Sequence, residues 1–174
     1  VYAKAKELLD DMIKDGSFII EDAPCYYLYE LTMEGRSQTG IVACSDVDDY
    51  QDQKIKKHEN TREDKELDRI RHVDVTDAQT GPIFLVYRSM QEINDIVAQS
   101  KEQTPLYDFT SADDITHRVW CISDQAVTAK LQEIFAGIPC TYIADGHHRC
   151  ASAVKVGLKR RQDNPGYTGE EEFN

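Results

Sequence analysis

The amino-acid sequence predicts an α+β fold, in which a mixed sheet is flanked by helices. Two observations carry this prediction: a β-hairpin pattern in the first half of the chain, and a strand-turn-helix unit near its end. With 174 residues, of which 40% are hydrophobic, the chain can bury a core. It begins without Met in a helical pattern and stops in a polar run. We therefore expect residues 1–174 to form a single domain from the centre of a longer protein.

The first half is expected to hold one helix and one hairpin. Residues 1–14 have apolar side chains at helical spacing, and Gly16 is a plausible stop. Residues 25–32 are rich in Tyr, Leu and Thr and predict a strand. Residues 33–36 form a short turn and residues 38–44 the return strand.

The rest of the chain is predicted to contain both helices and strands. Capping patterns predict helix starts at Ser45, Thr61 and Ser89. Apolar spacing predicts a helix over residues 124–135 and another from His147 onward. Apolar runs predict strands over residues 82–87, 106–109, 118–122 and 138–144.

Composition excludes some classes of protein. The formal net charge of -12 would repel a nucleic-acid backbone, so a broad DNA-binding face is not expected. A local positive pocket for a small anion remains compatible with that charge. No run approaches the ~20 apolar residues that span a bilayer. The five cysteines include no CxxC pair, so we expect reduced thiols and a cytoplasmic location.

The segment Asp-Gly-His-His-Arg is the expected chemical centre. A strand is predicted to end at Ala144, the chain turns at Asp145 and Gly146, and a helix begins near His147. Free N–H groups and the positive dipole end at a helix start form a natural anion site. Gly146 allows close backbone approach to a ligand, and Arg149 offers a fork that fits two phosphate oxygens. The turn therefore predicts a phosphate site.

The two histidines of this segment cannot act alike. His147 and His148 project about 100° apart on a helix, so at most one is expected to face the ligand. The other would hydrogen-bond to Asp145 or fix the loop. The simpler alternative makes Asp145 a plain N-cap and the histidines half-exposed polar residues. However, basic residues at a helix start oppose the dipole unless an anion compensates, and such local conflicts are typical of functional sites.

A second polar cluster covers residues 57–69 and mixes bases, hydroxyls and carboxylates. His58 and Glu59 are candidate general bases. The alternative is a solvated helix that Thr61 caps, in which ion pairs explain the later carboxylates, among them Glu66. Composition alone leaves both interpretations open.

Other metal-ligand residue types are weaker signals. Asp113 and Asp114 could bind a divalent cation, but acidic turn residues are more often caps. Cys140, His147 and His148 are zinc-ligand types, yet the sequence has no HExxH motif and no paired cysteines. No Walker loop, GxGxxG or GxSxG motif is present.

Several stretches together resemble one protein family. YIADGHHRCASA resembles the DGHHR signature of the bacterial DUF1015 family, and KKHENTREDKELDRI resembles its His-Glu-x-Thr segment. TGPIFLVYR and LYDFTSADDITHRVW are similar to it too, so the resemblance covers nearly all of the chain. Cys150 departs from the pattern, because an aromatic residue is usual there. We expect that change to alter packing and not chemistry.

The DGHHR turn is also remotely similar to the turn of the ParB and sulfiredoxin group. Some members of that group bind nucleotides there, and its free-serine kinases transfer a phosphoryl group. This similarity implies that Asp145 lies beside the phosphate. It does not identify the catalytic base, for which Glu30 and Glu59 are both candidates. It further implies a phosphate cradle formed by Gly146, His147, His148 and Arg149.

We therefore expect a nucleotide-dependent enzyme of kinase-like or phosphohydrolase-like type that acts on a small molecule. ATP or ADP with Mg²⁺ would be its cofactor, and Asp145 would contribute to the metal site. The alternatives are a module that senses a nucleotide or metabolite without chemistry and, against the charge, a ParB-like DNA-associated protein. The expected catalytic residues are His58, Glu59, Asp145, His147 and His148.

Overall fold

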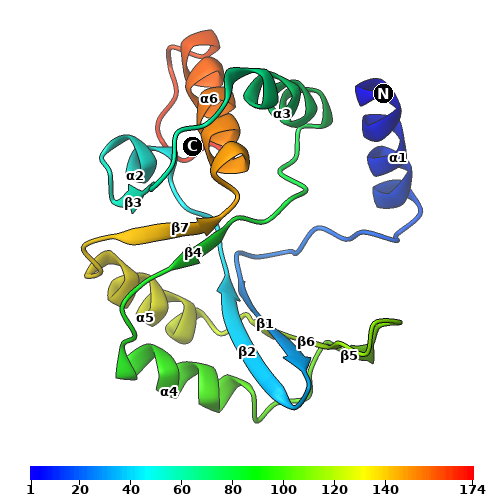
Figure 1. The fold of residues 1–174 in the computed structure, drawn as a ribbon, viewed down its shortest axis with the longest axis vertical. Coiled ribbons are helices and arrows are strands. Elements are labelled where there is room, and N and C mark those ends of the chain that lie inside the picture. Colours follow the sequence, from blue (N-terminus) through cyan, green and yellow to red (C-terminus); the bar gives the residue numbers. More distant parts are fainter. The chain divides into compact units, whose positions relative to one another are not determined.

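A computed structural model describes residues 1–174 and confirms the α+β class, with six helices and two sheets. The chain divides into two compact units, each assembled from separated segments (Figure 1). Unit 1 comprises residues 1–20, 45–87 and 139–174, and unit 2 comprises residues 21–44 and 88–138. No helix is both long enough and apolar enough to cross a membrane.

Unit 2 is built on an antiparallel sheet with the strand order β2-β1-β6-β5. Its core contains Leu28, Trp120, Ile122 and Leu131, all of which are buried. The predicted hairpin is confirmed, and its turn is closed by Glu34 and Gly35, both with positive φ. The elements of unit 2 are β1 (Tyr26–Met33), β2 (Arg36–Val42), α4 (Gln91–Ser100), β5 (Tyr107–Thr110), β6 (Thr116–Ile122) and α5 (Gln125–Ala136).

Unit 1 contains a small mixed sheet with the strand order β3-β7-β4, in which β3 is parallel and β4 antiparallel to β7. Its core contains Ile55, Ile143 and Cys150. The elements of unit 1 are α1 (Tyr2–Lys14), α2 (Val47–Gln51), β3 (Ile55–Lys56), α3 (Glu63–Thr76), β4 (Phe84–Val86), β7 (Thr141–Asp145) and α6 (His147–Asp163).

Strand β3 was not predicted from the sequence. It has only two residues, and Ile55 is its single buried side chain in a strongly polar stretch. One apolar residue gives no period-two signal, so the parallel pairing with β7 was not visible in the sequence.

Helix α6 follows directly from the end of β7 and packs along α3 (Figure 1). The spacing of Cys150, Val154 and Leu158 predicts one buried stripe on this helix. Cys150 and Val154 are buried and Leu158 is half-buried, while Ser152 and Gly157 are buried too. A Cβ at Gly157 would lie 2.5 Å from the carbonyl oxygen of Phe173. The C-terminal tail therefore lies directly on the backbone of α6.

None of the three predicted capping residues, Ser45, Thr61 and Ser89, is the N-cap of its helix. Helix α3 begins after Arg62 without a side-chain cap, and the Thr61 hydroxyl instead donates to Glu66 Oε1. Helix α4 begins after Met90, also without a side-chain cap. Helix α2 does have a side-chain cap, but Asp46 provides it, one residue after Ser45, by accepting from the Asp48 N–H at 2.8 Å.

Candidate functional site

The turn between β7 and α6 leaves the start of the helix open. Gly146 is the N-cap residue with φ +94°, and no side chain caps α6, so Asp145 is not a plain N-cap. The first helical backbone hydrogen bond runs from the Cys150 N–H to the Gly146 carbonyl at 2.9 Å. The N–H groups of His147, His148 and Arg149 have no hydrogen-bond partner in the chain. Three donors at the positive end of the helix dipole are thus available to an anion.

Arg149 lies in a slot formed by two glycines. A Cβ at Gly146 would lie 2.9 Å from Arg149 Nη2, and a Cβ at Gly81 would lie 3.0 Å from Arg149 Cδ. Arg149 Nη2 donates to Asp145 Oδ2 at 2.7 Å, and the buried Nε has no partner. The guanidinium is therefore held at the turn by Asp145 while one buried donor stays unpaired.

His147 is buried and faces a carboxylate. Only 6% of the residue is exposed, and its Nδ1 lies 3.3 Å from Glu59 Oε1. The ring of His58 packs edge-on against it, with centroids 4.4 Å apart. The buried Nε2 has no partner. A carboxylate at Nδ1 favours the tautomer with its proton there, which leaves Nε2 with a free lone pair.

His148 has a different role. The backbone N–H of Arg62 donates to His148 Nε2 at 3.1 Å. His148 thereby links the start of α6 to the residue that precedes α3, and the two histidines face different partners.

Glu66 on α3 is buried and forms hydrogen bonds with residues of α6. It is 4% exposed, accepts from Thr61 and Lys155, and its carbonyl accepts from Ser152 Oγ at 3.3 Å. Burial opposes the ionisation of Glu66, but the hydrogen bonds from Lys155 and Thr61 outweigh it and lower the pKa of the carboxyl. The alternative of a fully solvated helix is wrong at this position.

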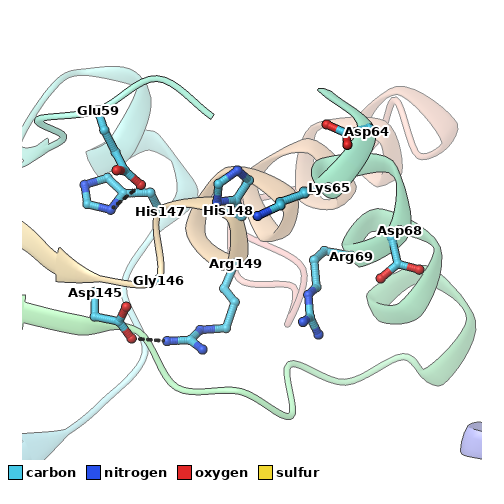
Figure 2. Close-up of a pocket in the computed structure, with 10 residues that line it drawn as sticks. All are labelled: Glu59, Asp64, Lys65, Asp68, Arg69, Asp145, Gly146, His147, His148 and Arg149. Carbon is cyan, nitrogen blue, oxygen red and sulfur yellow. Dashed lines mark hydrogen bonds and ion pairs between the residues drawn. The ribbon is translucent and has the colours of Figure 1, made fainter. Parts of the chain in front are cut away.

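The turn and α3 enclose a pocket of about 560 Å³, shown in Figure 2. The side chains of Lys65 and Arg69 project from α3 toward the turn (Figure 2). The pocket is lined by Glu59, Asp64, Lys65, Asp68, Arg69, Asp145, Gly146, His147, His148 and Arg149.

The carboxylates and the cations that line this pocket are not all paired with one another. Each carboxylate already has a partner: Glu59 faces His147, Asp64 pairs with Arg62, Asp68 accepts from Tyr2 and Asp145 pairs with Arg149. Lys65 and Arg69 make no ion pair. Two unpaired cations therefore face the same pocket as the three unpaired amides.

Lys65 and Arg69 lie within the predicted polar cluster of residues 57–69, but neither was a predicted site residue. A signal was present, because the two residues lie at i and i+4 on α3. Like charges at this spacing destabilise a helix by roughly 0.2–0.5 kcal/mol, so such a pair is a local conflict that an anion would relieve.

A second, smaller pocket of about 250 Å³ shares Arg69 and Arg149 with the first. His72, Gln79 and Gly81 contribute to its lining, and no carboxylate does. The two guanidinium groups thus border both cavities.

The structure brings most of the predicted residues together in unit 1. Glu59 lines the pocket, and His58 contacts His147 without lining it. Glu30, the other candidate base, belongs to unit 2, where it is buried and accepts from Lys101 and Thr39.

Cys150 is not suited to nucleophilic chemistry. The residue is 5% exposed and belongs to the core of unit 1. Burial raises the pKa of its thiol to about 11, so the thiolate is scarce at neutral pH. This agrees with the expected packing role of the residue.

Comparison with known proteins gives one match. Residues 1–174 match the family described as "Protein of unknown function (DUF1015)". No curated protein and no solved structure matches the chain. Because the match covers the whole chain and includes the turn and the pocket described above, this chain belongs to the DUF1015 family.

Proposed function

We propose that the DGHHR turn binds the phosphate groups of a small-molecule ligand, and that the protein is an enzyme of phosphoryl-transfer type. One observation carries the proposal: three unpaired helix-start amides and the unpaired cations Lys65 and Arg69 line the same pocket. Unpaired donors and cations of this kind fit a polyanion such as a nucleotide phosphate chain. The pocket volume of about 560 Å³ lies within the usual range for small-molecule sites.

The phosphate chain would lie between the turn and α3. The amides of His147 and His148 would bind the oxygens at the helix start, and Arg69 and Arg149 would bind the oxygens farther along. Both cavities border these two arginines, which gives room for more than one phosphate. ATP or ADP with Mg²⁺ is the ligand that we propose.

His147 and Glu59 are the proposed acid-base pair. Glu59 would hold the proton on His147 Nδ1, and Nε2 would accept the proton of an acceptor hydroxyl. The acceptor oxygen then bonds to phosphorus while the bond to the leaving oxygen breaks. Arg149 and the amides would stabilise the charge that develops on the transferred group.

Mg²⁺ would be bound chiefly by the phosphates. Asp145 is the carboxylate nearest the turn, and its side chain is 73% exposed although it pairs with Arg149. It could therefore offer an oxygen to the ion without leaving the pocket. We place this reaction in the cytoplasm because all five cysteines are free.

The decisive experiment is a calorimetric titration with ATP and ADP, each with and without Mg²⁺. Wild type should bind the nucleotide at one site. Arg69→Ala and Arg149→Ala should each weaken the affinity about 10- to 100-fold, because hydrogen bonds to charged groups contribute about 1.5–3 kcal/mol. Arg36→Ala, which removes an exposed arginine of unit 2, should leave the affinity unchanged. Absence of binding by folded wild type would reject the nucleotide as ligand.

A non-catalytic sensor is the second candidate function. The hydrogen bond from the Arg62 N–H to His148 supports it, because a ligand at the turn would act on the start of α3. Product formation from ATP distinguishes the two. An enzyme should lose turnover in Glu59→Gln and His147→Gln while it keeps nucleotide binding. Tight binding by wild type without turnover on any acceptor would favour the sensor.

A further inference from the structure

Unit 2 contains a cluster of metal-ligand side chains that the proposed reaction does not use. Glu21, Cys25 and Cys121 each present one ligand atom, and these atoms lie within 4.8 Å of one another. All three residues belong to unit 2, so the cluster is complete within one compact unit. The hydroxyl of Tyr27 donates to the carboxylate of Glu21 at the edge of the cluster.

The strand register explains why the two cysteines converge. Tyr27 on β1 pairs with Cys121 on β6, and the next pair along is Leu28 with Trp120. Leu28 and Trp120 face the core of unit 2. Side chains alternate between the faces of a strand, so Tyr27 and Cys121 lie on the opposite face. Cys25 immediately precedes β1, and its sulfur lies within 4.8 Å of the Cys121 sulfur.

We infer that Glu21, Cys25 and Cys121 form a binding site for a zinc-type divalent metal ion. Zn²⁺ takes thiolate, imidazole and carboxylate ligands in tetrahedral geometry, and three protein ligands leave one position for water. The carboxylate of Glu21 argues for Zn²⁺ over Cu(I), which selects sulfur ligands. The cysteines are half-buried and Glu21 is exposed, so an ion can enter from solvent.

Tyr27 orients one of the proposed metal ligands through a hydrogen bond. Ligating carboxylates are usually held by a further hydrogen bond, and the Tyr27 hydroxyl provides one to Glu21. Tyr27 also pairs with Cys121 across the strands, so one residue positions two of the three ligands. An ion here would join the segment before β1 to β6 and so stabilise unit 2.

The test is a titration of the purified, chemically reduced protein with Co²⁺, followed by competition with Zn²⁺. Thiolate-to-cobalt charge-transfer absorption should saturate at one equivalent and disappear when Zn²⁺ is added. Cys25→Ser and Cys121→Ser should abolish the absorption. Tyr27→Phe should weaken Co²⁺ affinity by roughly 10- to 100-fold, as other outer-shell substitutions do. Cys44→Ser removes an exposed cysteine outside the cluster and should bind like wild type.

Circular dichroism checks that each variant is folded. Zn²⁺ should raise the midpoint temperature of thermal unfolding of wild type but not of Cys25→Ser. Two results of the titration would overturn the site: no cobalt absorption with folded, reduced wild type, or unchanged absorption in a folded Cys25→Ser variant. A disulfide between Cys25 and Cys121, found by mass spectrometry of the protein as purified, would also overturn it. ATP binding at the DGHHR turn is measured separately and does not bear on these outcomes.

Discussion

Gly146 is the residue on which the geometry of the DGHHR turn depends most directly. Its φ of +94° is a conformation that side chains other than Gly rarely adopt, and it lets the end of β7 pass into α6 without a connecting loop. A Cβ there would also come within 2.9 Å of Arg149 Nη2. Backbone strain and displacement of Arg149 would therefore occur together.

We predict that Gly146→Ala lowers the free energy of unfolding by about 1–3 kcal/mol, the usual cost of such backbone strain. Chemical denaturation measures it. Gly166→Ala is the matched control, because a Cβ at Gly166 meets nothing within 4 Å and its φ is not positive. That variant should stay within about 0.5 kcal/mol of wild type. Equal losses in the two variants would contradict the role assigned to the Gly146 backbone.

At the scale of elements, the packing of α3 on α6 determines where the pocket residues lie. Glu66 is buried between these helices and accepts hydrogen bonds from Thr61 and Lys155. Burial by itself would disfavour the charged carboxylate, but the hydrogen bonds outweigh burial and lower its pKa below the ordinary value of 4.5. The charged form is therefore bound more tightly in the folded state than in the unfolded state.

A pH dependence follows from this lowered pKa. Because the pKa of Glu66 is lower in the folded state than in the unfolded state, its charged form stabilises the fold above the unfolded pKa of about 4.5. This stabilisation is lost as the pH falls from about 4.5 through the folded pKa. Denaturation midpoints measured from neutral pH downward should fall less steeply for Glu66→Gln than for wild type, although Glu66→Gln should be less stable at neutral pH. Glu63→Gln, an exposed change in the same helix, should follow wild type. Parallel curves for wild type and Glu66→Gln would refute the prediction.

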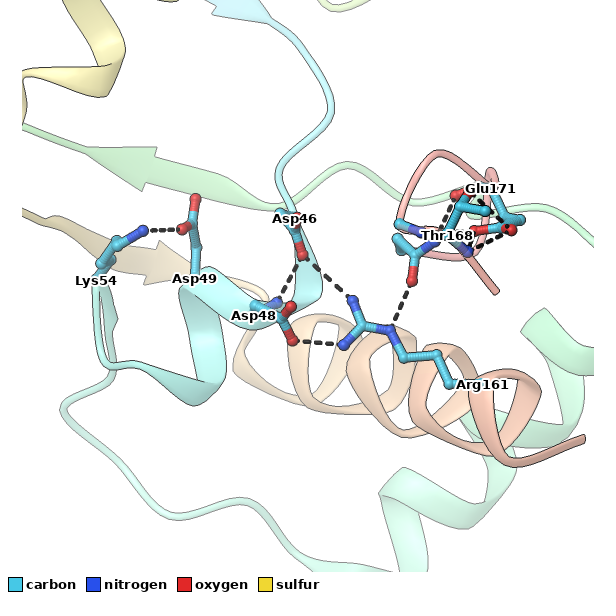
Figure 3. A network of polar contacts seen from close by, with 9 residues as sticks. Asp46, Asp48, Asp49, Lys54, Arg161, Thr168 and Glu171 are labelled. Carbon is cyan, nitrogen blue, oxygen red and sulfur yellow. Dashed lines mark hydrogen bonds and ion pairs between the residues drawn. The ribbon is translucent and has the colours of Figure 1, made fainter. Parts of the chain in front are cut away.

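At the scale of the whole molecule, each compact unit is assembled from segments that are distant in sequence. In unit 1, Arg161 on α6 joins two of them, as Figure 3 shows. Its guanidinium pairs with Asp46 and Asp48 at the start of α2, and Nε donates to Asn174 Oδ1 at 2.6 Å. The Arg161 side chain is 10% exposed, whereas the side chains of Asp46 and Asp48 are about half exposed.

We expect Arg161→Gln to loosen α2 and the C-terminal tail while leaving the pocket in place. Hydrogen exchange should increase in residues 46–52 and 164–174. The loss of stability should be about 0.5–1.5 kcal/mol, because water can solvate the half-exposed carboxylates of Asp46 and Asp48. Arg160→Gln is the neighbouring control, since Arg160 pairs with Asp74 and Asp77. Its effect should be confined to α3. Unchanged exchange in both segments of Arg161→Gln would show that other contacts hold them.

Local signals in the sequence determined the class of the fold and most of its elements. Apolar periodicity marked α1, α5 and α6, and the turn chemistry at Glu34 and Gly35 marked the hairpin. These features depend on neighbours in the chain, so the sequence displays them directly. The DGHHR segment was likewise identified from its residue types, and Gly146 does have the positive φ that a glycine there permits.

Tertiary structure alone decided which distant residues share a site. Nothing local indicated that Glu59 would face His147, that Arg62 would bond to His148, or that Lys65 and Arg69 would border the turn. The pairing of β3 with β7 and the convergence of Cys25 with Cys121 depend on strand register in the same way. Such contacts arise when separated segments pack together, and spacing along the chain does not encode which of them will meet.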